Sequence, residues 1–193
     1  MKTIVDDITN EIIIKNSRFI TLLIKIEDNT DVLDIVNRIK KDYPKATHYC
    51  YGYITENYKK SSDDGEPGGT AGIPILTTLE KENMINVLAI VVRYFGGIKL
   101  GAGGLVRAYT KAIKEAIDSS LLTELVPGYE ISITFNYDKQ KEVDYLFSKY
   151  EIISKDYLDK IIYKLYIPID RINLVEKYDY KILSKLLIKK QND

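Results

Sequence analysis

The sequence predicts an α+β protein that consists of two domains. Short segments rich in Ile, Val and Tyr, typical of strands, alternate with stretches in which apolar residues recur at helical spacing. A Pro127-Gly128 pair interrupts this pattern, so we expect one domain over residues 1–126 and a smaller one over residues 127–193. The chain length of 193 residues suffices for two small domains, and 45% apolar residues suffice for a buried core.

The first elements follow from local patterns. Residues 8–15 and 18–26 are rich in Ile, Leu and Thr, and the polar Asn16-Ser17 pair between them predicts a hairpin. After Thr30, apolar residues at helical spacing predict a helix that ends near Asp42.

The remaining elements of the first domain surround a polar segment. We expect a short aromatic strand over residues 48–55 and a long loop over residues 56–69. Thr70 is then expected to cap a helix that runs to about Glu82. Two further elements complete the domain: a strand covered on both faces, over residues 85–93, and a long helix, over residues 105–121.

The second domain repeats strands and helices on a smaller scale. Its pattern predicts three strands, over residues 129–137, 152–156 and 161–169. It also predicts a helix over residues 138–150 and a final, mostly helical segment over residues 172–189. This order fits a ferredoxin-like sandwich that lacks its last strand.

Composition restricts the compartment and the partners. The 28 Lys and Arg residues balance 28 Asp and Glu residues, so nucleic-acid binding would require a local basic patch. The single cysteine, Cys50, cannot form an internal disulfide, which favours a reducing compartment. The start of the chain lacks the apolar core of a signal peptide, and the longest apolar run, residues 87–92, is far shorter than the roughly 20 residues of a membrane span. We therefore expect a cytoplasmic protein without membrane attachment.

The strongest functional signal is a basic, glycine-rich segment. No Asp or Glu occurs between Asn83 and Lys114, whereas Arg93, Lys99, Arg107, Lys111 and Lys114 are all positive. Its glycines precede a predicted helix, whose unpaired N–H groups and dipole favour an anion. The segment predicts an RNA- or anion-binding site that includes Arg93, Lys99, Gly101, Gly103, Gly104, Arg107 and Lys111. Alternatively, the glycines only shape the connection, and the cations only solvate one helix face.

An acidic loop (residues 61–72) is the second candidate. Asp63, Asp64 and Glu66 lie close together in it, and carboxylate oxygens suit a divalent cation, although the spacing is not that of an EF-hand. The loop could equally be solvated, or its carboxylates could pair with the basic segment. The sequence leaves these alternatives, and so the question of a metal, open.

His48 and Cys50 form a third candidate, because residues two apart on a strand share a face. A thiolate beside an imidazole can act as a nucleophile, but it needs direct contact and an orienting third group. A lone strand cysteine is more often a small buried side chain. We expect no catalytic dyad here.

Several motifs together resemble the IMPACT/YigZ family. Five blocks occur in the order found in the family. They are Ser-Arg-Phe (17–19), Ala-Thr-His-Tyr-Cys-Tyr (46–51), Asp-Asp-Gly-Glu-Pro (63–67), Val-Val-Arg-Tyr-Phe-Gly-Gly-Ile-Lys-Leu-Gly (91–101) and Gly-Gly-Leu-Val-Arg-Ala-Tyr (103–109). Two positions differ, because Tyr49 stands where the family usually has Asn, and Gly69 stands where it often has Ser. The loss of Asn weakens any polar role at position 49.

The resemblance implies a first domain with the βαβ fold of elongation factor G domain IV and of a small-subunit ribosomal protein. It also implies a second domain similar to another elongation-factor module. It implies no established enzymatic activity, no catalytic residue and no cofactor, and His48 and Cys50 then belong to a family motif without an assigned role. Eukaryotic relatives restrain a translational stress response, largely through an additional RWD domain, so that role does not transfer.

Two functional hypotheses follow. The first is a non-catalytic, translation-associated protein that binds RNA or the ribosome through the basic glycine-rich surface, with a further protein partner unidentified. The second is an enzyme or binding protein for a phosphorylated small molecule or nucleotide at the same loop, although no Walker-type Lys-Ser pair is present. A salt titration separates them, because polynucleotide binding weakens steeply with salt.

Overall fold

The computed structural model describes residues 1–191. The chain divides into two compact units, Met1–Thr123 and Glu124–Asp193, each with its own antiparallel sheet. The α+β class predicted from the sequence is therefore confirmed. Among the described residues, no helix is both long enough and apolar enough to span a membrane.

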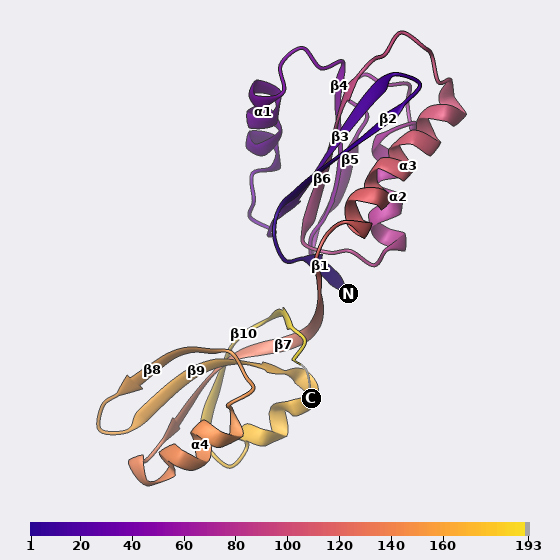
Figure 1. Cartoon of the computed structure of the whole chain (residues 1–193). Helices are drawn as coiled ribbons and strands as arrows, with labels where there is room; N and C mark the ends of the chain where they lie inside the picture. Colours follow the sequence, from indigo (N-terminus) through magenta and orange to yellow (C-terminus); the bar gives the residue numbers. More distant parts are fainter. Residues whose placement is uncertain (192–193) are drawn as a thin grey trace. The chain divides into compact units, whose positions relative to one another are not determined.

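The N-terminal unit contains a five-stranded antiparallel sheet (Figure 1). Its strands lie in the order β2 (Ile8–Ile14), β3 (Ser17–Lys25), β6 (Val87–Tyr94), β4 (His48–Ile54) and β5 (Lys59–Ser62). A short strand, β1 (Lys2–Ile4), bonds to the segment before β6, since the Lys2 amide donates to the Asn83 carbonyl. The predicted hairpin and the predicted aromatic strand are present.

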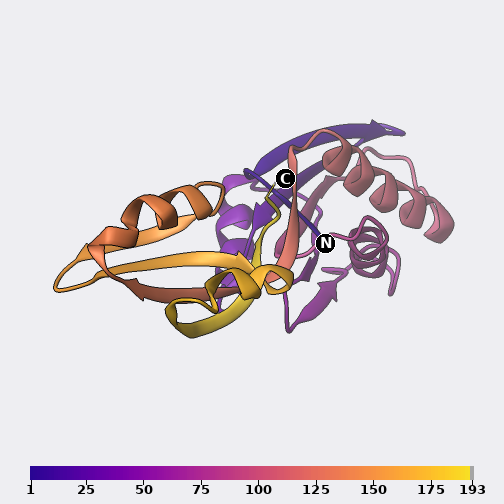
Figure 2. The ribbon, with the colours of Figure 1, turned by 90° about the horizontal axis from the view of Figure 1, so that it is seen from below.

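Three helices cover this sheet. α1 (Val32–Asp42) lies on one face, and α2 (Gly72–Lys81) and α3 (Ala102–Asp118) lie side by side on the other (Figures 1 and 2). Successive side chains of β6 point to opposite faces, so this strand contributes to two cores. Leu88, Ile90 and Val92 pack in the α1 core, and Val87, Ala89 and Val91 pack in the α2–α3 core. The prediction of a strand covered on both faces is confirmed.

Two boundaries in this unit differ from the predictions. The expected loop over residues 56–69 contains β5, an edge strand that pairs with β4 but has no apolar residue to reveal it. α3 begins at Ala102 instead of Leu105, so Gly103 and Gly104 lie in its first turn. The glycine-rich connection before the helix is therefore shorter than predicted.

The C-terminal unit has the strand and helix order of a ferredoxin-like sandwich. Its elements are β7 (Leu122–Phe135), which begins just before the unit, η1 (Tyr137–Lys139), α4 (Gln140–Leu146), β8 (Ile152–Tyr157), β9 (Ile161–Pro168), η2 (Ile169–Val175) and β10 (Asp179–Lys189). Its strands lie in the order β10-β7-β9-β8, and β7 also pairs with β1. Residues of α4 and η2, including Val143 and Val175, pack with the sheet residues Ile133 and Tyr163 in one core.

The prediction that residues 172–189 are mostly helical is wrong. This segment contains β10, which pairs antiparallel with β7 and completes the sandwich. A register shift between Ile182 and Ser184 breaks the alternation of apolar and polar residues, so the strand period is hidden in the sequence. The predicted helix over residues 138–150 is also shorter, and Pro127-Gly128 lies inside β7 instead of in a linker.

Candidate functional site

Asp63 organises the acidic loop at the start of α2. Its carboxylate accepts N–H groups from Gly69 at 2.9 Å, Ala71 at 3.0 Å and Gly72 at 2.8 Å. Burial alone would raise the pKa of Asp63, but these three donors lower it below its usual value. The expected cap, Thr70, instead donates its hydroxyl to a carbonyl within the loop.

Asp64 fastens the other side of the loop to β4. Its carboxylate accepts the Tyr49 amide at 2.7 Å and forms an ion pair with Lys40 at 3.0 Å. The backbone of Asp64 has a φ of +42°, and its carbonyl oxygen lies 2.9 Å from Nδ1 of His48. The loop therefore turns sharply back onto the strand.

Glu66 is the centre of a buried polar network (the Glu66 network: Glu66, Arg93, Tyr109 and Cys50). Oε1 of Glu66 accepts from Nη1 of Arg93 at 2.6 Å and from the Tyr109 hydroxyl at 2.8 Å. The two charged side chains are only 3% and 6% exposed. The Cys50 thiol lies 3.3 Å from the Tyr109 oxygen and 2.9 Å from the carbonyl of Asp63. The network joins the loop to β4, β6 and α3.

The thiol in this network is buried in surroundings that favour its protonated form. Burial raises the pKa of Cys50 to about 12, and burial also raises the pKa of Tyr109 far above its usual value. His48 bonds to the Asp64 carbonyl through Nδ1, while its Nε2 lies 3.7 Å from Oε2 of Glu66. Within residues 1–191, no hydrogen bond joins the imidazole to the thiol. The geometry favours a structural use of both side chains.

The three carboxylates of the acidic loop do not converge on a common point. Asp63 takes backbone amides, Asp64 takes Lys40 and a backbone amide, and Glu66 takes Arg93 and a tyrosine hydroxyl. In the described part of the chain, no group of three or more His, Cys, Asp or Glu side chains is placed to hold a metal ion.

Arg93 is buried, whereas the other cations of the predicted anion site are exposed. Its guanidinium is bound to Glu66 and stands over the rings of Phe19 and Phe95, with centroid distances of 5.4 and 5.6 Å. Its Nε is buried and has no partner among residues 1–191. The sequence predicts an acidic partner for Arg93, such as Glu66, because an unpaired charge at the end of a buried strand is costly.

Five side chains of the basic segment are exposed in the connection between β6 and α3 and in the first turns of α3 (the α3 surface: Phe95, Ile98, Lys99, Val106 and Arg107). All five side chains are exposed, with Phe95 at 45% and Ile98 at 46%. Within the described chain, neither Lys99 nor Arg107 forms an ion pair with an acid. Farther along the helix the charge is partly balanced, because Lys111 lies 3.5 Å from Glu115 and Lys114 lies 3.1 Å from Glu82.

The start of α3 borders this surface and is open. Gly101 precedes the helix with a φ of +70° and supplies no side-chain cap, and the first turn contains no acid. Ala102 and Gly103 are exposed and small, so the first amides of the helix are accessible. Arg107 reaches back along the helix, and its Nη1 lies 3.6 Å from the position a Cβ on Gly103 would take.

Two residues of this region were not singled out by sequence reasoning. Tyr109 has the spacing of a core residue of α3, and nothing local indicates that its hydroxyl reaches Glu66. Ser17 accepts the Gly96 amide at 3.1 Å, although 79 positions separate the two residues. Both residues lie within the family motifs, and membership of those motifs was the signal that could have identified them.

Comparisons with known proteins agree on one family. The model of the Impact N-terminal domain matches residues 15–117. YvyE of Bacillus subtilis, an IMPACT family member, is 45% identical over 112 residues, which cover 56% of this chain and 52% of YvyE. The chain thus spans about half the length of that relative. YigZ of Escherichia coli, another member, is 33% identical over 80% of this chain and 79% of its own.

One solved structure supports the fold. The crystal structure of a hypothetical protein aligns with a TM-score of 0.63 and 27% identity, over all of this chain and 98% of its own. The two-domain translational regulator Yih1 aligns over 62% of this chain and 47% of its own, with a TM-score of 0.37 and 23% identity. That likeness is too low to carry its role across.

Proposed function

The chain belongs to the IMPACT family, and on this premise we propose that it is a non-catalytic, translation-associated cytoplasmic protein that binds RNA, free or within the ribosome, through the α3 surface. One observation carries the proposal. Every charged side chain between Asn83 and Lys114 is positive, and the two beside the open start of α3 are exposed and without an acidic partner in residues 1–191.

The α3 surface has the groups that RNA contacts require. Lys99 and Arg107 can each neutralise a phosphate, and the uncapped amides of the first turn can donate to its oxygens. Phe95 presents an exposed ring on which an unstacked base can lie. Because the net charge of the whole chain is zero, binding depends on these few local contacts.

The test is fluorescence anisotropy with a labelled RNA across a series of salt concentrations. Lys99→Gln and Arg107→Gln should each weaken binding and should each lower the slope of log K against log salt by about one unit. Lys41→Gln is the matched control, because Lys41 is exposed on α1, on the opposite face of the sheet. If affinity and slope stay at wild-type values in both folded α3 variants, the α3 surface is not the RNA site.

A second candidate uses the same helix start. The accessible first-turn amides and the returning Arg107 also suit the phosphate of a nucleotide or another phosphorylated small molecule. Calorimetric titration with a mononucleotide would then show saturable one-to-one binding with a shallow salt dependence, which Arg107→Gln weakens. The RNA used above would show no stronger binding than the mononucleotide.

A further inference from the structure

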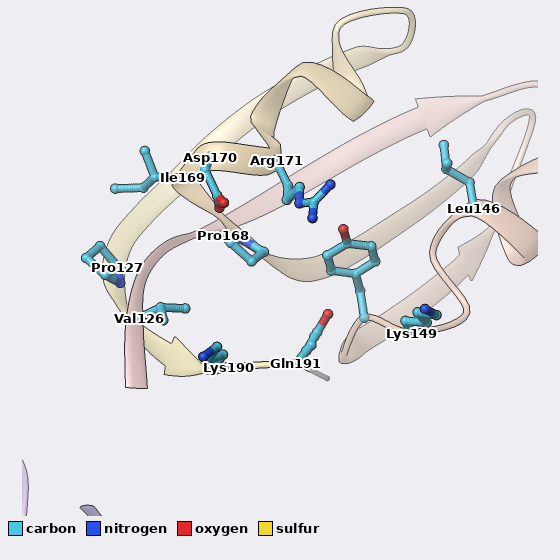
Figure 3. A pocket seen from close by; sticks show the side chains of 11 residues that line it. Val126, Pro127, Leu146, Lys149, Pro168, Ile169, Asp170, Arg171, Lys190 and Gln191 are labelled. Carbon is cyan, nitrogen blue, oxygen red and sulfur yellow. The ribbon is translucent and has the colours of Figure 1, made fainter. Parts of the chain in front are cut away.

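The C-terminal unit has an open cavity of about 690 Å³ at one end of its sheet (Figure 3). Apolar side chains such as Val126 and Leu146 line it together with charged ones, and Lys190 of this lining already forms an ion pair with Glu124 at 2.8 Å. The cavity therefore selects no particular class of ligand. One edge of the N-terminal sheet, by contrast, has a defined pattern.

This edge is the outer side of β2. β2 is the last strand on one side of the N-terminal sheet, where it pairs with β3. Within residues 1–191, no strand pairs with the N–H and C=O groups on its other side. The strand is rich in isoleucine, and the side chain of Ile13 is 67% exposed. Such an edge is a template for a further strand.

Other edge strands of the molecule have features that prevent this pairing. Short length, bulges and lysines are common protections of an edge. β5 has only four residues and includes Lys59 and Lys60. β8 has a register shift and the exposed Lys155, and β10 has a register shift and three lysines. β2 has seven residues, an unbroken register with β3, and neither lysine nor proline.

The sequence of β2 is complementary to itself in the antiparallel direction. When Glu11 is placed opposite Glu11 of a second copy, Ile8 lies opposite Ile14. In the same register Thr9 lies opposite Ile13. Pairs of β-branched side chains such as these stabilise neighbouring strands. The facing positions differ by an even number, so facing side chains lie on the same face of the joined sheet.

The charges agree with this register. Asp7 before β2 lies opposite Lys15 after it, so a dimer contains this opposite pair twice. Both side chains are exposed, and Asp7 is bonded within its own chain to a neutral donor, the Lys25 amide, at 2.8 Å. The like charges of the central Glu11 pair are offset, because each Glu11 is bound to its own Arg18 at 2.8 Å.

We propose that β2 pairs with β2 of a second copy of this chain, in the register centred on Glu11. The two five-stranded sheets then continue as one sheet about a two-fold axis perpendicular to it, and both copies use the same surface. α3 packs over β2 and β3 on one face, so the dimer carries both α3 helices on the same face of the joined sheet.

The test is sedimentation equilibrium of the full chain over a series of concentrations. The wild type should form a dimer that dissociates on dilution. Ile13→Lys places a lysine on the exposed edge and should give a monomer throughout the series. Ile73→Lys is the matched control and should dimerise like the wild type, because Ile73 is 58% exposed on α2, which packs over β4 and β5 at the far side of the sheet.

An exchange of charges tests the register itself. Lys15→Glu and Asp7→Lys each place like charges at both ends of the paired strands, and each should weaken the dimer about tenfold. An equimolar mixture of the two variants restores an opposite pair at both ends and should form a mixed dimer of nearly wild-type affinity. Folding of every variant is checked by its thermal unfolding curve. If Asp7→Lys does not fold, Ile13→Lys and Lys15→Glu decide without it.

Three results would overturn the proposal. The first is a wild type that stays monomeric at every concentration, which would leave this edge to a strand of a different protein. The second is a dimer that persists in folded Ile13→Lys, and the third is a mixture of the folded charge variants that associates as weakly as its components. None of these variants changes Lys99 or Arg107, so the RNA experiment succeeds or fails separately.

Discussion

For Arg93, the need for an acidic partner could be predicted from the sequence, but the identity of that partner, Glu66, could not. The buried strand β6 ends in a charge, and burying that charge demands an opposite charge nearby. The sequence offers three carboxylates in the acidic loop, and only Glu66 meets Arg93, since Asp63 and Asp64 turn to backbone amides. The choice among them depends on the path of the loop, which local sequence does not specify.

Cys50 provides a prediction at the same scale, because its thiol keeps its proton in the folded state. The pKa of Cys50 is about 12 in the native protein and near 9.0 for an unperturbed thiol. The unfolded chain therefore loses this proton first, and the stabilising contribution present below about pH 9 is lost as the pH rises toward 12. Urea unfolding should show the wild type losing free energy of unfolding faster than Cys50→Ala over this range, by up to about 1.4 kcal/mol per pH unit.

Parallel pH profiles for the two proteins would contradict this assignment. A catalytic role for Cys50 can be measured as well, because a catalytic thiol would react with iodoacetamide at neutral pH faster than a free thiol. His48→Ala would then remove that excess rate.

Whole elements were predicted where their own residues carry the signal and were missed where distant residues decide. The apolar run of β6 and the spacing of α1 are local, and both elements lie where predicted. The start of α2 depends on Asp63, which lies nine positions before Gly72 in the chain, and capping rules do not reach that far. β10 was missed because its bulge hides the strand period.

The cap of α2 yields a prediction about this element. Asp63→Ala removes the acceptor of three amides and should lower the free energy of unfolding by about 1–2 kcal/mol in urea at neutral pH. Asp63→Asn, which keeps one oxygen acceptor, should lose less. Because the native pKa of Asp63 is lowered, its contribution is present above its unfolded pKa near 3.8 and is lost as the pH falls through the native value.

The difference between wild type and Asp63→Ala should therefore shrink in acid. Asp118→Ala is the control, since Asp118 is an exposed acid at the end of α3 and should change stability little. A variant Asp63→Ala as stable as the wild type at neutral pH would show that the loop holds α2 without this carboxylate.

The whole molecule was predicted in its class and in its number of units. The family motifs lie at residues 17–109, and the described cores of α1 and of α2 and α3 draw only on the N-terminal unit. The predicted break after residue 126 and the divide at Thr123 differ because β7 continues through Pro127-Gly128. A proline–glycine pair reads as a turn in sequence, whereas its place in a ladder depends on β9 and β10.

We expect residues 1–123 to fold without the rest of the chain, because both of their cores are internal. The fragment should melt cooperatively and give dispersed amide signals in NMR. A fragment of residues 1–101 is the matched negative control, since it lacks α3 and with it Leu105, Tyr109 and Ile113 of the core. Aggregated or molten behaviour of residues 1–123 would mean that the unit depends on its C-terminal partner.

The central place of β6 has a consequence for a chain made from one end to the other. β2 and β3 form one hairpin and β4 and β5 form another, and β6 pairs with both β3 and β4, although it is the last of these five strands to be synthesised. Until Tyr94 has been added, the inner edges of the two hairpins, on β3 and β4, are unpaired as well as their outer edges, and unpaired edges recruit other chains. A premature stop before Val87 therefore leaves two hairpins with four open edges, whereas the complete sheet has two.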